Sequence, residues 1–344
     1  MMKKIFLMLC ALAGLLTMPD ITHAQSKYKD IAAGLQHAMV LKTDGTVWTF
    51  GLNSEGQLGD GTTISRDKPV KVLDNVSQIS AGECMCYAVR NDGTLWAWGE
   101  NQCGQLGDGT TTRRLRPVRV MSGVRKAVAG NNHVAIIKTD GTLWMAGDNA
   151  WLQLGDGTDE NHSTPVRVMY GVADVACGGR FTQVLGNDGS RWGCGDNRYG
   201  QLGDGSTEYP ERLTKVQDNG VKKISTGWEH TLILGKDGIL RGCGSNIDGQ
   251  LGMGPNVETT SYPSQILTDV KDVYAFDFTS FAILNNGTLY GWGANSNGQL
   301  GDGTKVTKQY PLKLRDNIRK VAAGGSFTMF LTTNGDLLVT GTIK

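Results

Sequence analysis

The sequence is poor in proline and histidine, has no excess of charge of either sign and contains a single long apolar run. It holds eight prolines and five histidines in 344 residues, and its 34 basic side chains are matched by 33 acidic ones. A near-neutral surface of mixed charges does not favour a nucleic-acid binder, which concentrates positive charge on one side. The apolar run covers residues 5–16, which is too short to cross a membrane as a mature helix.

Local catalytic motifs are also missing. The sequence contains no Gly-x-Ser-x-Gly elbow, no His-Glu-x-x-His pair, no phosphate-binding loop and no dinucleotide fingerprint. These absences favour a protein that is not an enzyme and that needs neither a cofactor nor a metal. They do not address a site assembled from residues that are distant in the sequence.

The first 24 residues have the pattern of a secretory signal peptide. Two lysines precede the apolar run, and small residues before a cleavage point follow it, ending at Ala24. We therefore predict a signal peptide over residues 1–24 and a mature, exported chain over residues 25–344 that is secreted or periplasmic. No later apolar run is long enough to span a bilayer, so no membrane anchor is expected.

One ten-residue motif returns throughout the chain. It reads NSEGQLGDGT at Asn53 and recurs with small changes every 48 or 49 residues, at Asn101, Asn149, Asn197, Asn246 and Asn295. A period this steady indicates one supersecondary unit repeated along the chain, in which each unit buries its apolar face against its neighbours. The fold is therefore predicted from the unit, and the function from the places where the copies differ.

Each unit is predicted to form four short strands. A strand of small residues such as IAAG leads to an apolar strand such as HAMVLK, and a tight turn leads to an aromatic strand such as TVWTFG. The glycine-rich motif then precedes a strand that often begins with proline, as at Pro69, which suits an outer edge. Asp-Gly and Asn-Gly pairs favour two-residue hairpin turns. Seven of these pairs stand between the predicted second and third strands of a unit, and they begin at Asp44, Asp92, Asp140, Asp188, Asp237, Asn286 and Asn334.

Seven four-stranded units of about 48 residues predict an all-β fold, a seven-bladed β-propeller over residues 25–344. The seventh copy stops at Lys344, before a fourth strand. We expect the last blade to be one strand short and its hairpin to close beside the N-terminal strand near Tyr28 to Gly34. A monomer is expected.

The repeat resembles that of the regulator of chromosome condensation family. The shared pattern is a Gly-x-x-His strand start, an Asp-Gly turn, a Trp-x-x-Gly strand and an Asn-x-x-Gly-Gln-Leu-Gly loop, and it covers essentially the whole predicted mature chain. The resemblance implies a propeller that binds proteins. It does not fix an activity, because one fold carries many functions. Nucleotide exchange on a nuclear GTPase, an activity of this family, is incompatible with the predicted export.

The repeated polar residues are interpreted as structural. Each glycine loop offers a single aspartate, whereas a calcium loop gathers several oxygen ligands, so turn chemistry is favoured over a metal site. These aspartates are Asp60, Asp108, Asp156, Asp204 and Asp302. His37, His133 and His230 share one repeat position with Met85 and Phe181. A position that accepts methionine and phenylalanine is a packing position, so buried, hydrogen-bonded histidines are predicted.

Six cysteines follow the predicted signal peptide, and their scatter argues against a shared disulfide framework. Cys84 and Cys86 point to one side of a strand, a weak half-site for a metal, and buried thiols are the favoured interpretation. Cys194 and Cys243 hold the same place in consecutive units, where packing is again favoured. A disulfide between them is the open alternative.

The departures from the repeat gather on one predicted face. Because neighbouring strands alternate in direction, the loop between the first two strands and the loop after the third strand lie on the same side of the propeller. Aromatic and arginine residues, which dominate protein interfaces, gather in these loops in copies three to six. The predicted partner-binding residues are Trp151, Arg180, Arg198, Tyr199, Tyr209, Trp228, Glu229 and Phe278.

The sequence therefore predicts a secreted, non-enzymatic module that binds an extracytoplasmic protein through these loops. In architecture the chain is also similar to a secreted propeller that inhibits β-lactamases, which implies inhibition of a β-lactamase or a cell-wall enzyme. Two alternatives stay open. One is a glycan-binding adhesin module, and the other is a polysaccharide-acting hydrolase. The hydrolase would need facing carboxylates, for which Asp159, Glu160 and Glu229 are available.

Overall fold

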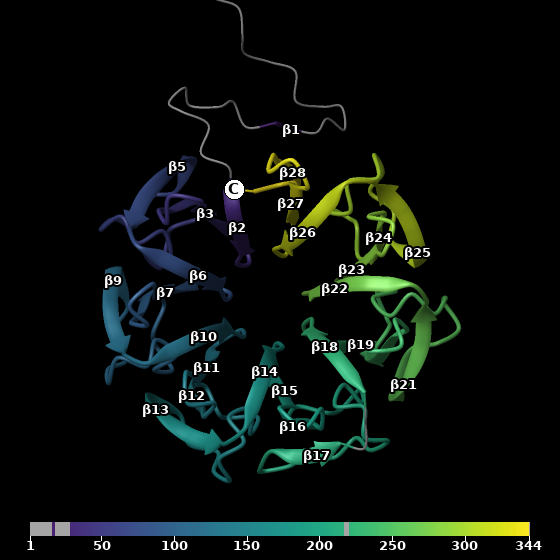
Figure 1. Ribbon diagram of the computed structural model, residues 1–344, viewed down its shortest axis with the longest axis horizontal. Coiled ribbons are helices and arrows are strands. Elements are labelled where there is room, and N and C mark those ends of the chain that lie inside the picture. The colour runs from purple at the N-terminus through teal and green to yellow at the C-terminus, as the bar shows by residue number, and fades with distance from the viewer. Residues whose placement is uncertain (1–15, 18–27, 217–219, 344) are drawn as a thin grey trace, which may run out of the picture.

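The computed structural model of the protein describes residues 16–17, 28–216 and 220–343. Seven four-stranded antiparallel sheets stand around a central axis (Figure 1), which confirms the predicted seven-bladed β-propeller. All of its named elements are strands, and within the described ranges no helix is long and apolar enough to cross a membrane. The predicted signal peptide, residues 1–24, lies outside the described residues except at Leu16–Thr17.

Each blade contributes strands at four distances from the axis. The innermost strands are β2 (Tyr28–Ala33), β6 (Val76–Ala81), β10 (Val124–Ala129), β14 (Val172–Cys177), β18 (Val221–Thr226), β22 (Val270–Phe276) and β26 (Ile318–Ala323). The second strands are β3 (His37–Lys42), β7 (Met85–Arg90), β11 (His133–Lys138), β15 (Phe181–Gly186), β19 (His230–Gly235), β23 (Thr279–Leu284) and β27 (Phe327–Thr332). The third strands are β4 (Val47–Gly51), β8 (Leu95–Gly99), β12 (Leu143–Gly147), β16 (Arg191–Gly195), β20 (Leu240–Ser245), β24 (Leu289–Gly293) and β28 (Leu337–Gly341). The outer strands of the first six blades are β5 (Arg66–Leu73), β9 (Arg114–Met121), β13 (His162–Met169), β17 (Thr214–Val216), β21 (Thr259–Leu267) and β25 (Lys308–Arg315).

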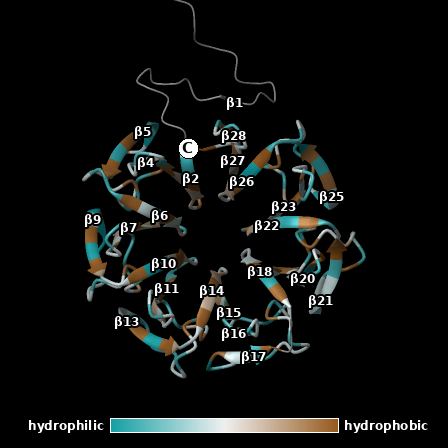
Figure 2. Ribbon diagram, in the orientation of Figure 1, coloured by the Kyte–Doolittle hydropathy of each residue, from teal (hydrophilic) through white to brown (hydrophobic). Residues whose placement is uncertain are grey.

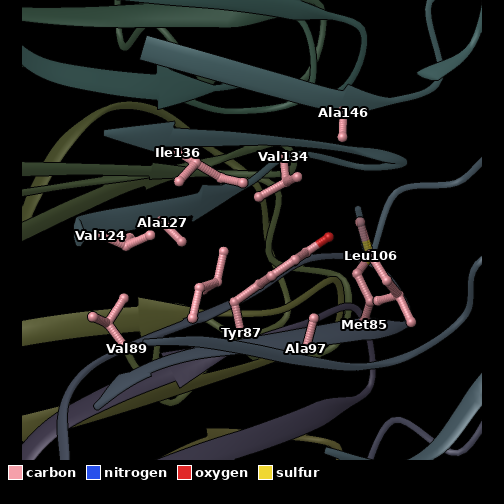
Figure 3. Packing of buried hydrophobic residues seen from close by; sticks show 11 residues of the cluster. Met85, Tyr87, Val89, Ala97, Leu106, Val124, Ala127, Val134, Ile136 and Ala146 are labelled. Atoms are coloured by element: carbon pink, nitrogen blue, oxygen red, sulfur yellow. The ribbon is translucent and has the colours of Figure 1, made fainter. Parts of the chain in front are cut away.

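The hydrophobic core lies between the blades. The second strands are buried on both of their faces, and in β7 only the last residue is partly exposed. Figure 3 shows one such interface, where Tyr87 packs with Val134 and Ile136 of the next blade. The Tyr87 hydroxyl donates a hydrogen bond to the Gln105 carbonyl at 2.5 Å, so burial leaves its polar atom satisfied. In Figure 2, hydrophobic and hydrophilic segments alternate along outer strands such as β5 and β25, as expected of strands buried on one face.

Hydrogen bonds inside the ten-residue motif explain why it is repeated. In the second blade the fully buried Asn101 accepts from the Leu106 N–H at 2.9 Å and donates from Nδ2 to the Thr110 carbonyl at 3.0 Å. Asp108 accepts from the Thr110 N–H and hydroxyl at 3.0 and 2.7 Å and pairs with Arg114 at 2.6 Å. The asparagine therefore closes the loop from within, and the aspartate caps its turn. Both residues have the structural role that the sequence predicted.

The three repeated histidines join neighbouring blades. His133 is fully buried, and its Nε2 lies 3.0 Å from the Thr182 hydroxyl, which itself donates to the Gln153 carbonyl at 2.8 Å. Because the hydroxyl proton is used there, His133 Nε2 is the donor and Nδ1 is unprotonated. In the same way, His37 Nε2 lies 3.1 Å from the Cys86 sulfur, and His230 Nε2 lies 2.9 Å from the Ser280 hydroxyl. The predicted buried, hydrogen-bonded histidines are confirmed.

The ring closes between the seventh and first blades. In the seventh sheet the two-residue strand β1 (Leu16–Thr17) pairs with β28 at Val339 and Leu338, in the place that outer strands hold in the other blades. The strand β2 belongs to the first sheet and packs against β26 and β27 across the blade interface. Lys320 pairs there with Asp30, and the Gly325 N–H donates to the Leu35 carbonyl at 3.0 Å.

Candidate functional site

Backbone hydrogen bonds place two sets of loops on one side of the propeller. After the third strand, the Asp148 N–H donates to the Asn132 carbonyl at 2.8 Å, and the Asp196 N–H donates to the Arg180 carbonyl at 2.9 Å. Each bond joins the loop after a third strand to the loop between the first two strands of the same blade. We call the side that carries these loops the variable face. The opposite side carries the tight turns, in which Asp44 accepts from the Thr46 N–H and hydroxyl at 2.9 and 2.7 Å.

Five of the predicted site residues form one group on this face, which we call the Trp151 cluster: Trp151, Arg180, Arg198, Tyr199 and Tyr209. The guanidinium carbons of Arg180 and Arg198 lie 4.8 and 4.6 Å from the centroid of the Trp151 ring. The Tyr209 ring is tilted against the same indole at 6.2 Å, and Arg198 also lies 5.8 Å from the Tyr199 ring. Cation–π contacts at these distances hold both guanidinium groups in place.

The two arginines of the cluster differ in their charge partners. Arg198 makes a bidentate pair with Asp196, donating from Nε to Oδ1 at 3.1 Å and from Nη2 to Oδ2 at 2.6 Å, and Asp196 is only 2% exposed. Hydrogen bonding to this carboxylate raises the pKa of Arg198 further above its ordinary value. Arg180 has no ion pair within the described ranges.

A break in the repeat explains why the cluster forms at the third and fourth blades. Leu152 stands where the other loops have glycine, and it keeps the left-handed backbone of that glycine, with φ of 64°. A Cβ at Gly104 would lie 2.5 Å from the Ser163 Cα on the next outer strand. At Leu152 the following outer strand, β17, is only three residues long and begins after Tyr209. The shortened strand leaves Tyr209 in a loop, where it contacts Trp151.

The remaining three predicted residues lie in the fifth and sixth blades. The rings of Trp228 and Phe278 are 6.5 Å apart and tilted by 39°. Burial raises the pKa of Glu229, while the charges of Arg198 and Arg180 act in the opposite direction. Glu229 therefore interacts electrostatically with the two arginines of the Trp151 cluster. All eight residues lie in loops of the variable face, and their role in binding stays a prediction.

The sequence reasoning missed a cavity at the mouth of the central channel on this face. It has a volume of about 120 Å³, and its lining includes Leu35, Glu83, Trp228, Phe276 and Asp277. Burial and the neighbouring carboxylates raise the pKa of Asp277 to about 6. An alignment of the copies could have indicated this cavity. Leu35, Glu83, Trp228 and Asp277 hold the same repeat position, in the loop directly after the first strand of each copy.

The structure also places the residues of two alternatives that the sequence left open, a disulfide between Cys194 and Cys243 and a hydrolase site. Cys194 is a free thiol that donates to the Gln153 carbonyl at 3.4 Å, so no disulfide joins it to Cys243. The sulfur of Cys243 lies 3.6 Å from the Gln201 carbonyl, again against the preceding glycine loop. Both cysteines therefore fill packing positions. Of the carboxylates considered for a hydrolase, Asp159 and Glu160 are exposed and Glu229 is half-buried.

Comparison with known proteins places the chain in a family. A model described as the RCC1-like domain matches residues 15–269, which is more than half of the chain. The protein belongs to the RCC1-like domain family. Models of the regulator of chromosome condensation (RCC1) repeat also match residues 270–299 and 286–331. Propellers of this family are typically binding or exchange-factor modules, and the family resemblance seen in the sequence is confirmed.

Solved structures show the same fold. Human WBSCR16 superposes with a TM-score of 0.81 at 23% identity, over 92% of this chain and 87% of that one. Prp20p from Saccharomyces cerevisiae superposes with a TM-score of 0.79 at 22% identity, over 92% and 82% of the two chains. At this identity the likeness establishes the fold alone.

Proposed function

We propose that the protein is an exported, non-enzymatic module whose variable face binds a protein partner outside the cytoplasm. The observation that carries the proposal is the Trp151 cluster, in which one indole holds two guanidinium groups within 5 Å and a tyrosine ring against its side. Tryptophan, tyrosine and arginine are the residues most enriched in binding hot spots. Their mutual contacts reduce the side-chain entropy that binding would otherwise remove.

The partner class follows from the predicted export and from family behaviour. The structure of yeast Prp20p was described together with its binding to Gsp1p and histones, which are protein ligands of that relative. A secreted propeller that inhibits β-lactamases is similar to this chain in architecture. We therefore propose a β-lactamase or a cell-wall enzyme as the partner, inhibited by occlusion of its active site.

The test uses purified candidate enzymes and residues 25–344 of this protein. Affinity is measured by biolayer interferometry and inhibition by the hydrolysis rate of a chromogenic β-lactam. We expect Trp151→Ala and Tyr209→Ala each to weaken binding at least tenfold, which corresponds to about 1.4 kcal/mol. The matched control is Tyr310→Ala, because Tyr310 is 61% exposed on the outer strand β25.

The control variant is expected to bind like the natural chain. Unchanged affinity of both cluster variants for a bound enzyme would refute the placement of the interface. Saturable binding of cell-wall glycans, lost in the same variants while no enzyme binds, would favour the adhesin alternative instead.

A further inference from the structure

The channel mouth on the variable face is a cavity lined by residues from all seven blades. The cavity has a volume of about 120 Å³. Leu35, Trp228 and Phe276 form apolar parts of its wall, and Glu83 and Asp277 contribute two carboxylates. No lysine or arginine is among the described residues that line it. The cavity therefore combines aromatic surface with negative charge that nothing in its wall neutralises.

Backbone carbonyl groups add to the negative potential at the mouth. The cavity is lined by the glycines that directly follow the inner strands of four consecutive blades, Gly34, Gly82, Gly130 and Gly178. A Cβ on Gly34 would lie 2.3 Å from the Gly82 oxygen, and one on Gly82 would lie 2.5 Å from the Gly130 oxygen. Successive carbonyl groups are thus packed against the next glycine, and within the described chain these oxygens accept no hydrogen bond. Carbonyl oxygens without donors favour a cation or a hydrogen-bond donor.

The charges that surround Asp277 are all of one sign. Asp248 and Glu229 of the fifth blade and Glu83 of the second act on Asp277 in the same direction as burial, and together they raise its pKa to about 6. Burial also raises the pKa of Glu83, against a hydrogen bond from Asn131. Carboxylates that repel one another in a half-buried site lack a countercharge. A cation that enters the mouth would supply it.

We propose that the cavity receives the charged end of a lysine or arginine side chain from the protein partner. Asp277 and Glu83 would pair with the cation, and the rings of Trp228 and Phe276 would offer cation–π contact. This inference rests on the proposed function of the variable face, and it adds that the partner presents a protruding basic residue over the channel.

The test uses the free protein and a small probe, so no partner is required. Nα-acetyl-arginine-N-methylamide is titrated against the ¹⁵N-labelled protein, and the Trp228 indole resonance is followed by NMR. The neutral control is the corresponding citrulline compound, which has nearly the same shape. We expect saturable shifts with the arginine probe, at least fivefold weaker binding of citrulline, and binding that strengthens as the pH rises from 5 to 7 because Asp277 loses its proton.

A variant pair makes the test specific. Asp277→Asn keeps the size of the side chain and the left-handed backbone, with φ of 41°, that asparagine tolerates well. With Glu83→Gln it is expected to weaken arginine binding at least fivefold, whereas Asp159→Asn, an exposed loop carboxylate, is expected to change nothing. The inference would be overturned if the citrulline compound bound as tightly as the arginine probe, or if the double variant bound the arginine probe as tightly as the natural chain.

The inference and the proposed function fail separately. Loss of partner binding in Trp151→Ala together with no arginine binding at the mouth would remove the cavity site and keep the interface. Arginine binding at the mouth together with unchanged partner affinity in the cluster variants would keep the cavity site and remove the proposed interface.

Discussion

Removing the asparagine that closes the Trp151 loop gives the sharpest test of how the repeat holds its site. Asn149 is fully buried in the loop that carries Trp151. Its Oδ1 accepts from the Leu154 N–H at 3.0 Å, and its Nδ2 donates to the Thr158 carbonyl at 2.7 Å and to Asp156 at 3.2 Å. Asn149→Ala removes all three bonds and leaves the buried Leu154 N–H without an acceptor.

The expected cost follows from these three bonds. A buried hydrogen bond contributes about 1 kcal/mol net, and a buried donor left unpaired costs at least as much, so the substitution is expected to lower the free energy of unfolding by about 3 kcal/mol. The opening of the loop should become easier by a similar amount. Since about 1.4 kcal/mol is a factor of ten, hydrogen exchange of the Leu154 amide should accelerate about 100-fold.

Two measurements check this prediction. Urea denaturation followed by tryptophan fluorescence gives the change in unfolding free energy, and native-state hydrogen exchange reports on the Leu154 amide. The matched control is Asn187→Ala, because Asn187 is an exposed turn residue, and a change within about 0.5 kcal/mol is expected there. If Asn149→Ala matched the control in both measurements, the asparagine would not be what holds the loop.

Two further predictions concern a histidine and a leucine. Burial lowers the pKa of His133 to about 4, whereas histidine in the unfolded chain has a pKa near 6.5. As the pH falls, the unfolded chain therefore binds the proton first. Protonation of this histidine should lower the free energy of unfolding by about 3 kcal/mol between pH 6.5 and pH 4. His133→Phe, the residue of the equivalent Phe181, should flatten that part of a pH series of urea midpoints; an unchanged pH slope would contradict the assignment. Leu152→Gly relieves a left-handed backbone and is expected to raise the free energy of unfolding by up to about 1 kcal/mol, measured by urea denaturation; clear destabilisation would show that packing of the leucine outweighs its strain.

The candidate site was predictable in part, for reasons visible in individual residues. Trp151 and Trp228 stand out because they break the rule that tryptophans occupy third strands, and both lie in loops of the variable face. Their mutual arrangement was not predictable, because the contact of Trp151 with Tyr209 depends on the short strand β17. Asp277 was missed because its repeat position is acidic in only two of the seven copies, at Glu83 and Asp277, and no local pattern shows that this position lines the central cavity.

The sequence by itself determined the propeller. Hairpin turns at Asp-Gly pairs, two-residue periodicity in the strands and the closed Asn loop are local properties, and each is satisfied within one copy or between adjacent copies. Only the tertiary structure decided which loops share a site. Closing seven blades brings the ends of the inner strands to a common axis, so Glu83 of the second blade and Asp277 of the sixth line the same cavity. Their proximity follows from the closure of the ring, which no stretch of sequence contains.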